Sequence, residues 1–408
     1  MHKQGETLTK KKEKLILLVL GILIALGPFS IDMYLPGFES IAKEFNTNKA
    51  AVGLSLTSFF IGLGIGQLIY GPLMDKYGRK KPLFIGLTIY ILTAMSCFYS
   101  PSLDWLIASR FLMALGASAG MVASKAILRD VFPPKEVARS MSFLMLIVGV
   151  APIIAPSIGS MVTANFTWHY IFLVLAIFAA MIFASVFFFL PESVQPDKTV
   201  RLRLKKVAAK YRGIFVDKVF FTFALSNSLT VGALFAYIAH APVLFMDLYG
   251  LSYVHFGWIF SINAGGLILG SQVNRWVLKG HSTFRVSIFN SVLLVILSVL
   301  LLLSSYLYSN FYTTFTLLFL ILFLLGFQNP NTTALSLDPF ETRAARASAL
   351  IGGLKMSFGA LTSYFISEFS SVSLLPLAVV LLACFVLSSL LLFRFQKKEK
   401  RALISIGR

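Results

Sequence analysis

The chain has 408 residues, of which 57% are hydrophobic and 13% are charged, and its mean hydropathy is +0.81. This composition has too few polar groups to cover a water-soluble surface, so it places the chain in a lipid bilayer. The formal net charge of +19 would indicate nucleic-acid binding in a soluble protein, and the positions of the positive residues therefore decide its meaning.

Stretches long enough to cross a membrane recur along the whole chain. A transmembrane helix needs about 20 mostly apolar residues. We therefore predict an all-α polytopic membrane protein, with 12 transmembrane helices in two pseudo-symmetric six-helix bundles. The predicted spans, to within several residues, are 15–36, 51–74, 82–99, 103–125, 140–162, 168–190, 216–246, 255–278, 286–307, 311–333, 344–368 and 373–395.

The positive residues lie almost entirely on one side of these spans. Of the 36 lysines and arginines, 32 fall in the two tails and the loops that share their side, whereas Lys43 and Lys49 lie opposite and Arg110 and Lys355 lie within spans. Cytoplasmic loops carry this excess, so we expect a multi-pass protein of the inner (cytoplasmic) membrane with both termini in the cytoplasm. The basic residues near the inner helix ends are expected to attract anionic lipid as anchors and not as a ligand site.

The first apolar run follows a basic tail, as a signal peptide does, but it contains Asp32 and Pro36 and lacks a cleavage site. We interpret it as a retained helix. Cys97 and Cys384 lie inside apolar spans without partners at metal-like spacing, so no disulfide and no metal site is expected.

The longest polar interval, residues 191 to 218, divides the spans six and six. We predict an N-terminal six-helix bundle over 1–190, a partly helical cytoplasmic linker over 191–215, and a C-terminal six-helix bundle with a basic cytoplasmic tail over 216–408. The loops after the second helix of each half, 71–77 and 270–276, share a Gly, an Asp or Asn, a cation and an aromatic residue at equal offsets. This likeness is typical of a duplicated transporter fold.

The loop from Gly71 to Lys81 reads GPLMDKYGRKK. It resembles the signature G-x-L-x-D-R-x-G-R-R/K of the major facilitator superfamily, with a lysine in place of the usual first arginine, and the resemblance implies the major facilitator fold. The alternative is an ordinary positively charged loop.

The residue types in this loop suggest a gate. Gly71 and Gly78 permit close helix approach and a tight turn. Asp75 can accept hydrogen bonds from free N–H groups at a helix start, which the resemblance places in the helix beginning near residue 344. Arg79 can pair with Asp130. Such a latch would hold the two halves closed on the cytoplasmic side.

Arg110 lies inside a span, in the segment 106–116. This segment resembles the motif of proton-coupled members of the superfamily, in which the arginine takes part in proton transfer, although Met113 and Ala114 replace the usual Gln and Gly. Rise per residue brings Asp32 to nearly the same depth, so the two side chains could meet. We predict that Asp32 carries the proton with Arg110 as its partner. The alternative for Asp32 is an interfacial aspartate at an outer helix end.

The span 140–162 contains Pro152 and Pro156, which are expected to bend it. Residues 149–160 resemble the antiporter motif G-x-x-x-G-P-x-x-G-G of exporters, with Ala155 and Ser160 in place of two glycines. General packing of small residues between membrane helices is the alternative.

Segments 32–36, 110–117, 237–242 and 330–334 resemble the Bcr/CflA drug-efflux subfamily. The resemblance implies multidrug efflux, hence antibiotic resistance, by proton antiport of varied small compounds such as bicyclomycin, phenicols or sulfonamides. Lys355, with Arg110 and Asp32, would make the cavity cationic and tolerant of anionic substrates. The candidate substrate-binding residues, each of which could instead pack between helices, are Tyr34, Met113, Tyr237, His240, Asn263 and Lys355.

Three functional classes remain distinguishable. A proton/drug antiporter that exports small molecules by alternating access explains the motifs together, and the alternatives are an exporter of an endogenous metabolite or a symporter or importer of the same fold. An enzyme is not expected, because the five histidines are scattered and neither H-E-x-x-H nor a Walker A sequence occurs. We expect a monomer that binds small molecules and protons, binds no nucleic acid, and needs no cofactor beyond the proton gradient.

Overall fold

The computed structural model describes residues 10–196, 204–307, 310–369 and 372–406. This described part is all helical, and twelve of its helices are long and apolar enough to cross a membrane, which confirms the predicted fold class. The α-helices are α1 (Lys10–Asp32), α2 (Phe38–Glu44), α3 (Lys49–Tyr77), α4 (Lys80–Phe98), α5 (Leu103–Val131), α6 (Pro134–Asn165), α7 (His169–Phe189), α8 (Leu204–Phe215), α9 (Lys218–Pro242), α10 (Tyr253–Val277), α11 (Thr283–Leu307), α12 (Phe311–Leu337), α13 (Ala344–Glu368) and α14 (Leu375–Ile406).

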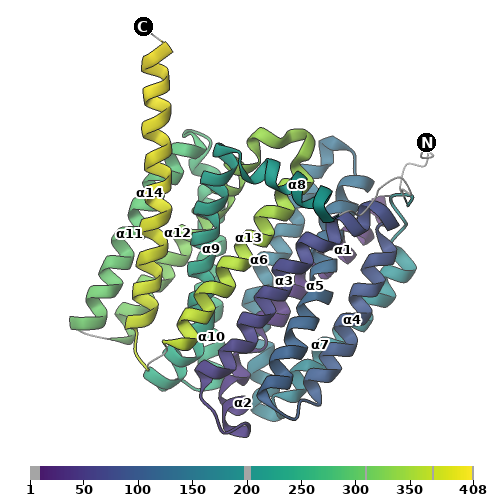
Figure 1. The fold of residues 1–408 in the computed structure, drawn as a ribbon. Coiled ribbons are helices and arrows are strands. Elements are labelled where there is room, and N and C mark those ends of the chain that lie inside the picture. The colour runs from purple at the N-terminus through teal and green to yellow at the C-terminus, as the bar shows by residue number, and fades with distance from the viewer. Residues whose placement is uncertain (1–9, 197–203, 308–309, 370–371, 407–408) are drawn as a thin grey trace.

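The long helices form one bundle, and α1 begins at the same end of it as α14 stops (Figure 1). We call this the tail end. The helix α8 lies across the tail end, whereas the short helix α2 lies at the opposite end, which we call the far end. The chain therefore crosses the bundle an even number of times, as the distribution of positive charge predicts.

Several helix ends differ from the predicted spans for local reasons. α1 ends at Asp32, and a short turn, η1 (Leu35–Gly37), follows because Pro36 cannot donate the next helical hydrogen bond. α9 ends at Pro242 and continues as a π-helical turn, η2 (Val243–Leu248). α14 runs beyond the apolar span to Ile406, because hydropathy ends a span where the charges begin while the helix itself continues.

Two helix pairs form most of the contact between the first half (α1–α7) and the second (α9–α14): α3 packs on α13, and α6 packs on α10. The hydroxyl of Thr57 donates to Ser363 over 2.9 Å in the first pair, and Ser261 donates to the carbonyl of Ile153 over 2.6 Å in the second. A Cβ atom on Gly64 would lie 3.2 Å from Met356 and 3.4 Å from the Gly353 carbonyl, so small residues set the helix spacing here.

Candidate functional site

Asp32 ends α1 at the boundary between the two halves. Its side chain is only 3% exposed, and no described lysine, arginine or histidine lies within ion-pair distance. Tyr237 of α9, in the other half, lies within electrostatic range of it. An unpaired buried carboxylate is costly to keep ionised, so this position favours the protonated form.

Arg110 lies on α5, fully buried in the first half. Its guanidinium carbon stands 4.0 Å from the ring centre of Phe59, 4.6 Å from that of Tyr34 and 5.8 Å from that of Phe172. The Nη1 atom lies 3.8 Å from the sulfur of Met113, while Nε and Nη2 have no hydrogen-bond partner. The arginine is thus held mainly by cation–π contacts, which are strongest in desolvated sites.

The expected pairing of Asp32 with Arg110 is wrong for this conformation. The two side chains form no ion pair, and Arg110 instead contacts Tyr34, two residues beyond Asp32. Tyr34 lies beyond the last residue of α1, and its ring packs in the first half against Arg110, Phe38 and Phe172, so the chain after Asp32 carries Tyr34 to the arginine. Equal depth alone does not bring side chains together.

The predicted substrate-binding residues fall into two buried groups. Tyr34 and Met113 surround Arg110, and the Tyr34 hydroxyl lies 2.8 Å from that of Ser55. Tyr237 and Asn263 form a pair in which the Asn263 amide donates to the Tyr237 hydroxyl over 2.9 Å. All four are at most 1% exposed, so their role in substrate binding stays a prediction.

His240 lies near the far end of α9, fully buried, with Nε2 2.9 Å from the carbonyl of Ser373. This contact ties α9 to the segment before α14. The Nδ1 atom has no hydrogen-bond partner. The arrangement fits a packing role at least as well as the predicted substrate-binding role.

Lys355 is the one predicted substrate-binding residue that keeps partial exposure. Its ammonium group donates to the Asn329 side chain over 2.9 Å and to the Thr333 hydroxyl over 3.1 Å, both on α12. The Asn227 amide of α9 also donates to Thr333, over 2.7 Å. No described carboxylate pairs with Lys355, so an ammonium group stands in a polar cluster without a counter-charge.

Lys125 is a residue that the sequence analysis did not single out, because it ends an apolar span and was counted with the loop charges. It belongs to α5 of the first half and lies within electrostatic range of Lys355 of the second half. Within the described chain, no carboxylate lies within ion-pair distance of it. Two lysines without a carboxylate partner among the described residues therefore stand on opposite halves.

The predicted ion pair between Arg79 and Asp130 is present, with Nε 2.9 Å from Oδ2. The Nη1 atom of Arg79 also lies 2.9 Å from Asp75, and Glu192 accepts hydrogen bonds from the backbone N–H groups of Arg79 and Lys80. Burial lowers the pKa of Arg79, but the bonds to Asp130 and Asp75 outweigh it and hold that pKa above its ordinary value. The guanidinium is thus a fixed charge.

This loop network departs from the prediction in one respect. All its members belong to the first half or to residue 192, and no hydrogen bond joins Asp75 to the described part of α13, so the network does not latch the halves together here. Tyr211 of α8 lies within electrostatic range of both Asp75 and Arg346 of α13 and donates to the Leu68 carbonyl over 3.4 Å. The linker helix thus stands between the predicted partners.

The two loop glycines behave differently. Gly78 has φ +80°, a left-handed conformation that favours glycine, and it makes the predicted tight turn. Gly71 makes no close helix contact, because a Cβ atom there would meet only the Tyr211 hydroxyl at 3.9 Å, so that expectation is wrong. Pro152 and Pro156 both lie inside the continuous helix α6, and their predicted bending role stays a prediction.

A second polar network, also outside the sequence-based predictions, joins the halves at the far end. The ammonium group of Lys49, at the start of α3, makes a short ion pair with Asp247 in η2 and lies 3.6 Å from Glu39 on α2. The side chain of Lys49 is only 8% exposed. In the sequence, Lys49 stands out only as one of the two basic residues on the side opposite the tails.

Comparison with known proteins shows which family the chain resembles. The profile of the Major Facilitator Superfamily matches residues 20–363. The MFS-type transporter YdgK of Bacillus subtilis is 33% identical over 95% of this chain and 97% of its own, and the bicyclomycin resistance protein homolog of Haemophilus influenzae is 30% identical over 93% and 96%. The multidrug resistance protein D of Escherichia coli is 26% identical over 83% and 85%.

Solved structures show the same fold at low sequence identity. A bacterial homolog of the human lysosomal transporter Spinster, in an inward-facing and occupied conformation, aligns with a TM-score of 0.73 at 14% identity, covering 95% of this chain and 98% of its own. A D-xylose-proton symporter aligns with a TM-score of 0.72 at 16% identity, covering 94% and 98%.

Proposed function

The chain belongs to the major facilitator superfamily and is a multi-pass membrane transporter, not an enzyme, and from this premise we propose that it exports small molecules from the cytoplasm in exchange for protons. The tail end then faces the cytoplasm and the far end faces outward, as the charge asymmetry favours. The protein acts as a monomer in the inner membrane, driven by the proton gradient without a cofactor.

The observation that carries the proposal is the isolation of Asp32. Asp32 is buried at the boundary between the two halves, with no cation beside it. Such a carboxyl group is stable in its protonated form when it is enclosed, and it ionises when water reaches it. Alternating access would expose it to the two sides in turn. Proton uptake from outside and release inside would then drive the cycle.

Export, as opposed to import, draws support from relatives and from α6. Two relatives are named as a bicyclomycin resistance protein homolog and a multidrug resistance protein. The small residues of α6 contact the second half directly: a Cβ atom on Gly149 would lie 3.3 Å from Ile268 of α10. A helix that bears prolines at this interface suits a rocking motion.

The test begins with a susceptibility and efflux panel, including bicyclomycin, in a pump-deficient host with and without a protonophore. An exported compound is then followed in proteoliposomes with an imposed pH gradient. We expect Asp32→Asn to bind this compound as tightly as the wild type but to lose gradient-driven transport, because the amide cannot exchange the proton. Asp104→Asn, at an exposed aspartate in the first turn of α5, is the matched control.

If Asp32→Asn still exports the compound at the wild-type rate under a pH gradient, Asp32 has no role in proton coupling. Uptake into cells that is driven by the inward proton gradient would instead show an importer. If no panel compound moves but an endogenous metabolite does, the coupling stands and the drug assignment is wrong.

A further inference from the structure

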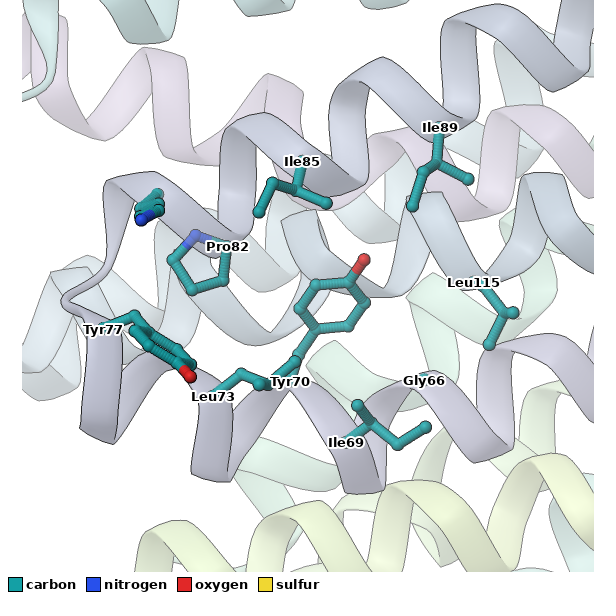
Figure 2. A pocket seen from close by; sticks show the side chains of 10 residues that line it. Gly66, Ile69, Tyr70, Leu73, Tyr77, Pro82, Ile85, Ile89 and Leu115 are labelled. Atoms are coloured by element: carbon teal, nitrogen blue, oxygen red, sulfur yellow. The ribbon is translucent and has the colours of Figure 1, made fainter. Parts of the chain in front are cut away.

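A groove runs along the membrane-facing side of the first half, between α3 and α4, with α5 at its floor. It encloses about 470 Å³, and its lining includes Ile69, Tyr70, Tyr77, Lys81, Ile85 and Ile89. Figure 2 shows Tyr77 and Pro82 at one end, Leu115 and Ile89 at the other, and the Tyr70 ring between the two helices. Ile69 and Ile85 remain 46% and 52% exposed, so the groove is open sideways, toward lipid.

The two ends of the groove differ in polarity. Lys81 and Tyr77 stand at the end near the tail end of the bundle, and the residues beyond them are apolar apart from the Tyr70 hydroxyl. From Lys81 to Ile89 α4 rises by about 12 Å. One leaflet contributes about 15 Å of hydrocarbon. The groove thus has the depth of one leaflet, with its charge at the level of the headgroups.

The cations at this end lack counter-charges. The ammonium groups of Lys76 and Lys81 lie 5.0 Å and 5.9 Å from the centre of the Tyr77 ring, so the aromatic ring holds two positive charges beside the groove. Among the described residues, no carboxylate lies within ion-pair distance of either lysine.

The nearby acidic groups are already engaged. Asp75 and Asp130 bind Arg79, and Glu192 accepts the backbone N–H groups at the start of α4. An external anion is therefore the partner that this end of the groove lacks. Because the remaining wall is apolar and faces lipid, the matching ligand carries a hydrocarbon chain.

We propose that this groove binds one anionic phospholipid of the leaflet on the tail side, which is the cytoplasmic leaflet in the proposed orientation. The basic residues at this groove thus form a ligand site, in contrast to the general anchoring role that the sequence predicts for them. One acyl chain lies between α3 and α4 against Tyr70, Ile85 and Ile89. The phosphate and the headgroup stand between Lys81 and Lys76. The site goes beyond the proposed transport function, because it lies on the outer surface of one half and does not depend on proton coupling.

The experiment measures lipid binding to the full-length protein, purified in a neutral detergent, by native mass spectrometry. The probes are phosphatidylglycerol and phosphatidylcholine with identical acyl chains. We expect one phosphatidylglycerol to bind more tightly than phosphatidylcholine. Each lysine is worth about five-fold in affinity for an anionic surface, so Lys76→Gln with Lys81→Gln should weaken phosphatidylglycerol binding about 25-fold. Phosphatidylcholine binding should weaken less, because the ammonium group of this lipid already offsets its phosphate.

The duplicated fold supplies the matched control for charge. Arg275→Gln with Lys279→Gln removes two charges at and near the corresponding loop of the second half and should leave the bound phosphatidylglycerol in place. For the groove itself, Ile85→Trp fills it and should displace the lipid, while Leu92→Trp, seven residues further along α4 and 64% exposed, should not.

Four results would overturn the proposal. The first is equal binding of the two lipids to the wild type, and the second is equal loss in the loop variant and its control. The third is unchanged binding in Ile85→Trp. Displacement of phosphatidylglycerol by millimolar inorganic phosphate would also overturn it, because it would show a site for a free anion.

Discussion

Two cations inside the bundle are accommodated in different ways, and the difference follows from their chemistry. Arg110 has a flat, weakly hydrated guanidinium, which lies against the rings of Phe59 and Tyr34. Lys355 has a compact ammonium group, which needs hydrogen-bond acceptors and finds them in Asn329 and Thr333. Neutral acceptors leave its charge uncompensated, so Lys355 is available to a negative substrate group while Arg110 is enclosed.

We predict that Lys355 selects for negative charge in the substrate. A charged hydrogen bond is worth about 1.5–3 kcal/mol, so Lys355→Gln should weaken binding of an exported carboxylate about 10- to 100-fold. Binding of its carboxamide should change little. The measurement is ligand-dependent thermal stabilisation of the purified protein, which requires no proton gradient and is independent of transport direction.

Lys125→Gln should weaken binding of the same carboxylate in the same direction, because Lys125 adds positive charge from the opposite half. Lys218→Gln, at the start of α9, is the control and should leave both affinities unchanged. If Lys355→Ala leaves the transport of every exported compound as it was, Lys355 has no part in substrate selection.

At the scale of the helices, glycine positions determine which pairs pack closely. A Cβ atom on Gly270 of α10 would overlap the Phe323 carbonyl oxygen of α12, and this backbone atom cannot rotate away. On the same helix, a Cβ atom on Gly265 would meet nothing within 4 Å. One helix thus offers a crowded glycine and an open glycine in the same lipid environment.

We predict that Gly270→Ala destabilises the protein by about 1–3 kcal/mol, because α10 and α12 must separate to admit the methyl group. Gly265→Ala should be neutral or stabilising by up to about 1 kcal/mol, since alanine is the better helix former. Thermal unfolding of the two purified variants, followed by helical circular dichroism, measures the difference. Equal melting temperatures of Gly270→Ala and Gly265→Ala would show that α10 and α12 can move apart at little cost in stability.

Hydropathy and charge predicted the number and the order of the helices because both depend only on composition along the chain. They did not predict how each helix is rotated about its axis, which sets the partners of its side chains. The Asp32–Arg110 pairing failed for this reason. Lys125 was missed because a lysine at the end of an apolar span reads as a loop charge, and whether it turns inward depends on packing.

The far end and the tail end of the molecule are held by different contacts. At the far end Lys49 and Asp247 pair across the two halves, whereas the arginine network of the tail-end loop stays within the first half. At the tail end, Tyr211 of α8 lies within electrostatic range of Asp75 of α3 and Arg346 of α13. The ion pair between Lys49 and Asp247 therefore bridges the halves at the far end. It should favour the conformation in which the far end is closed.

We predict that breaking the Lys49–Asp247 pair shifts the whole molecule toward opening at the far end. Lys49→Met leaves Asp247 without its partner at a largely buried contact, which costs more than the loss of an exposed pair. Spin labels at Asn165→Cys and Leu307→Cys, on opposite halves at the far end, report the distance between the halves. The native cysteines are buried and should not compete for the label.

Lys43→Met is the matched control, because Lys43 pairs with Glu39 on the same short helix and is exposed. It should leave the label distances at their wild-type values, whereas Lys49→Met should lengthen them in a larger share of molecules. Lys49→Arg keeps a positive charge beside Asp247 and Glu39 and should keep the shorter distances. If Lys49→Arg behaves like Lys49→Met, the effect belongs to packing around Lys49, and the ion pair does not hold the far end closed.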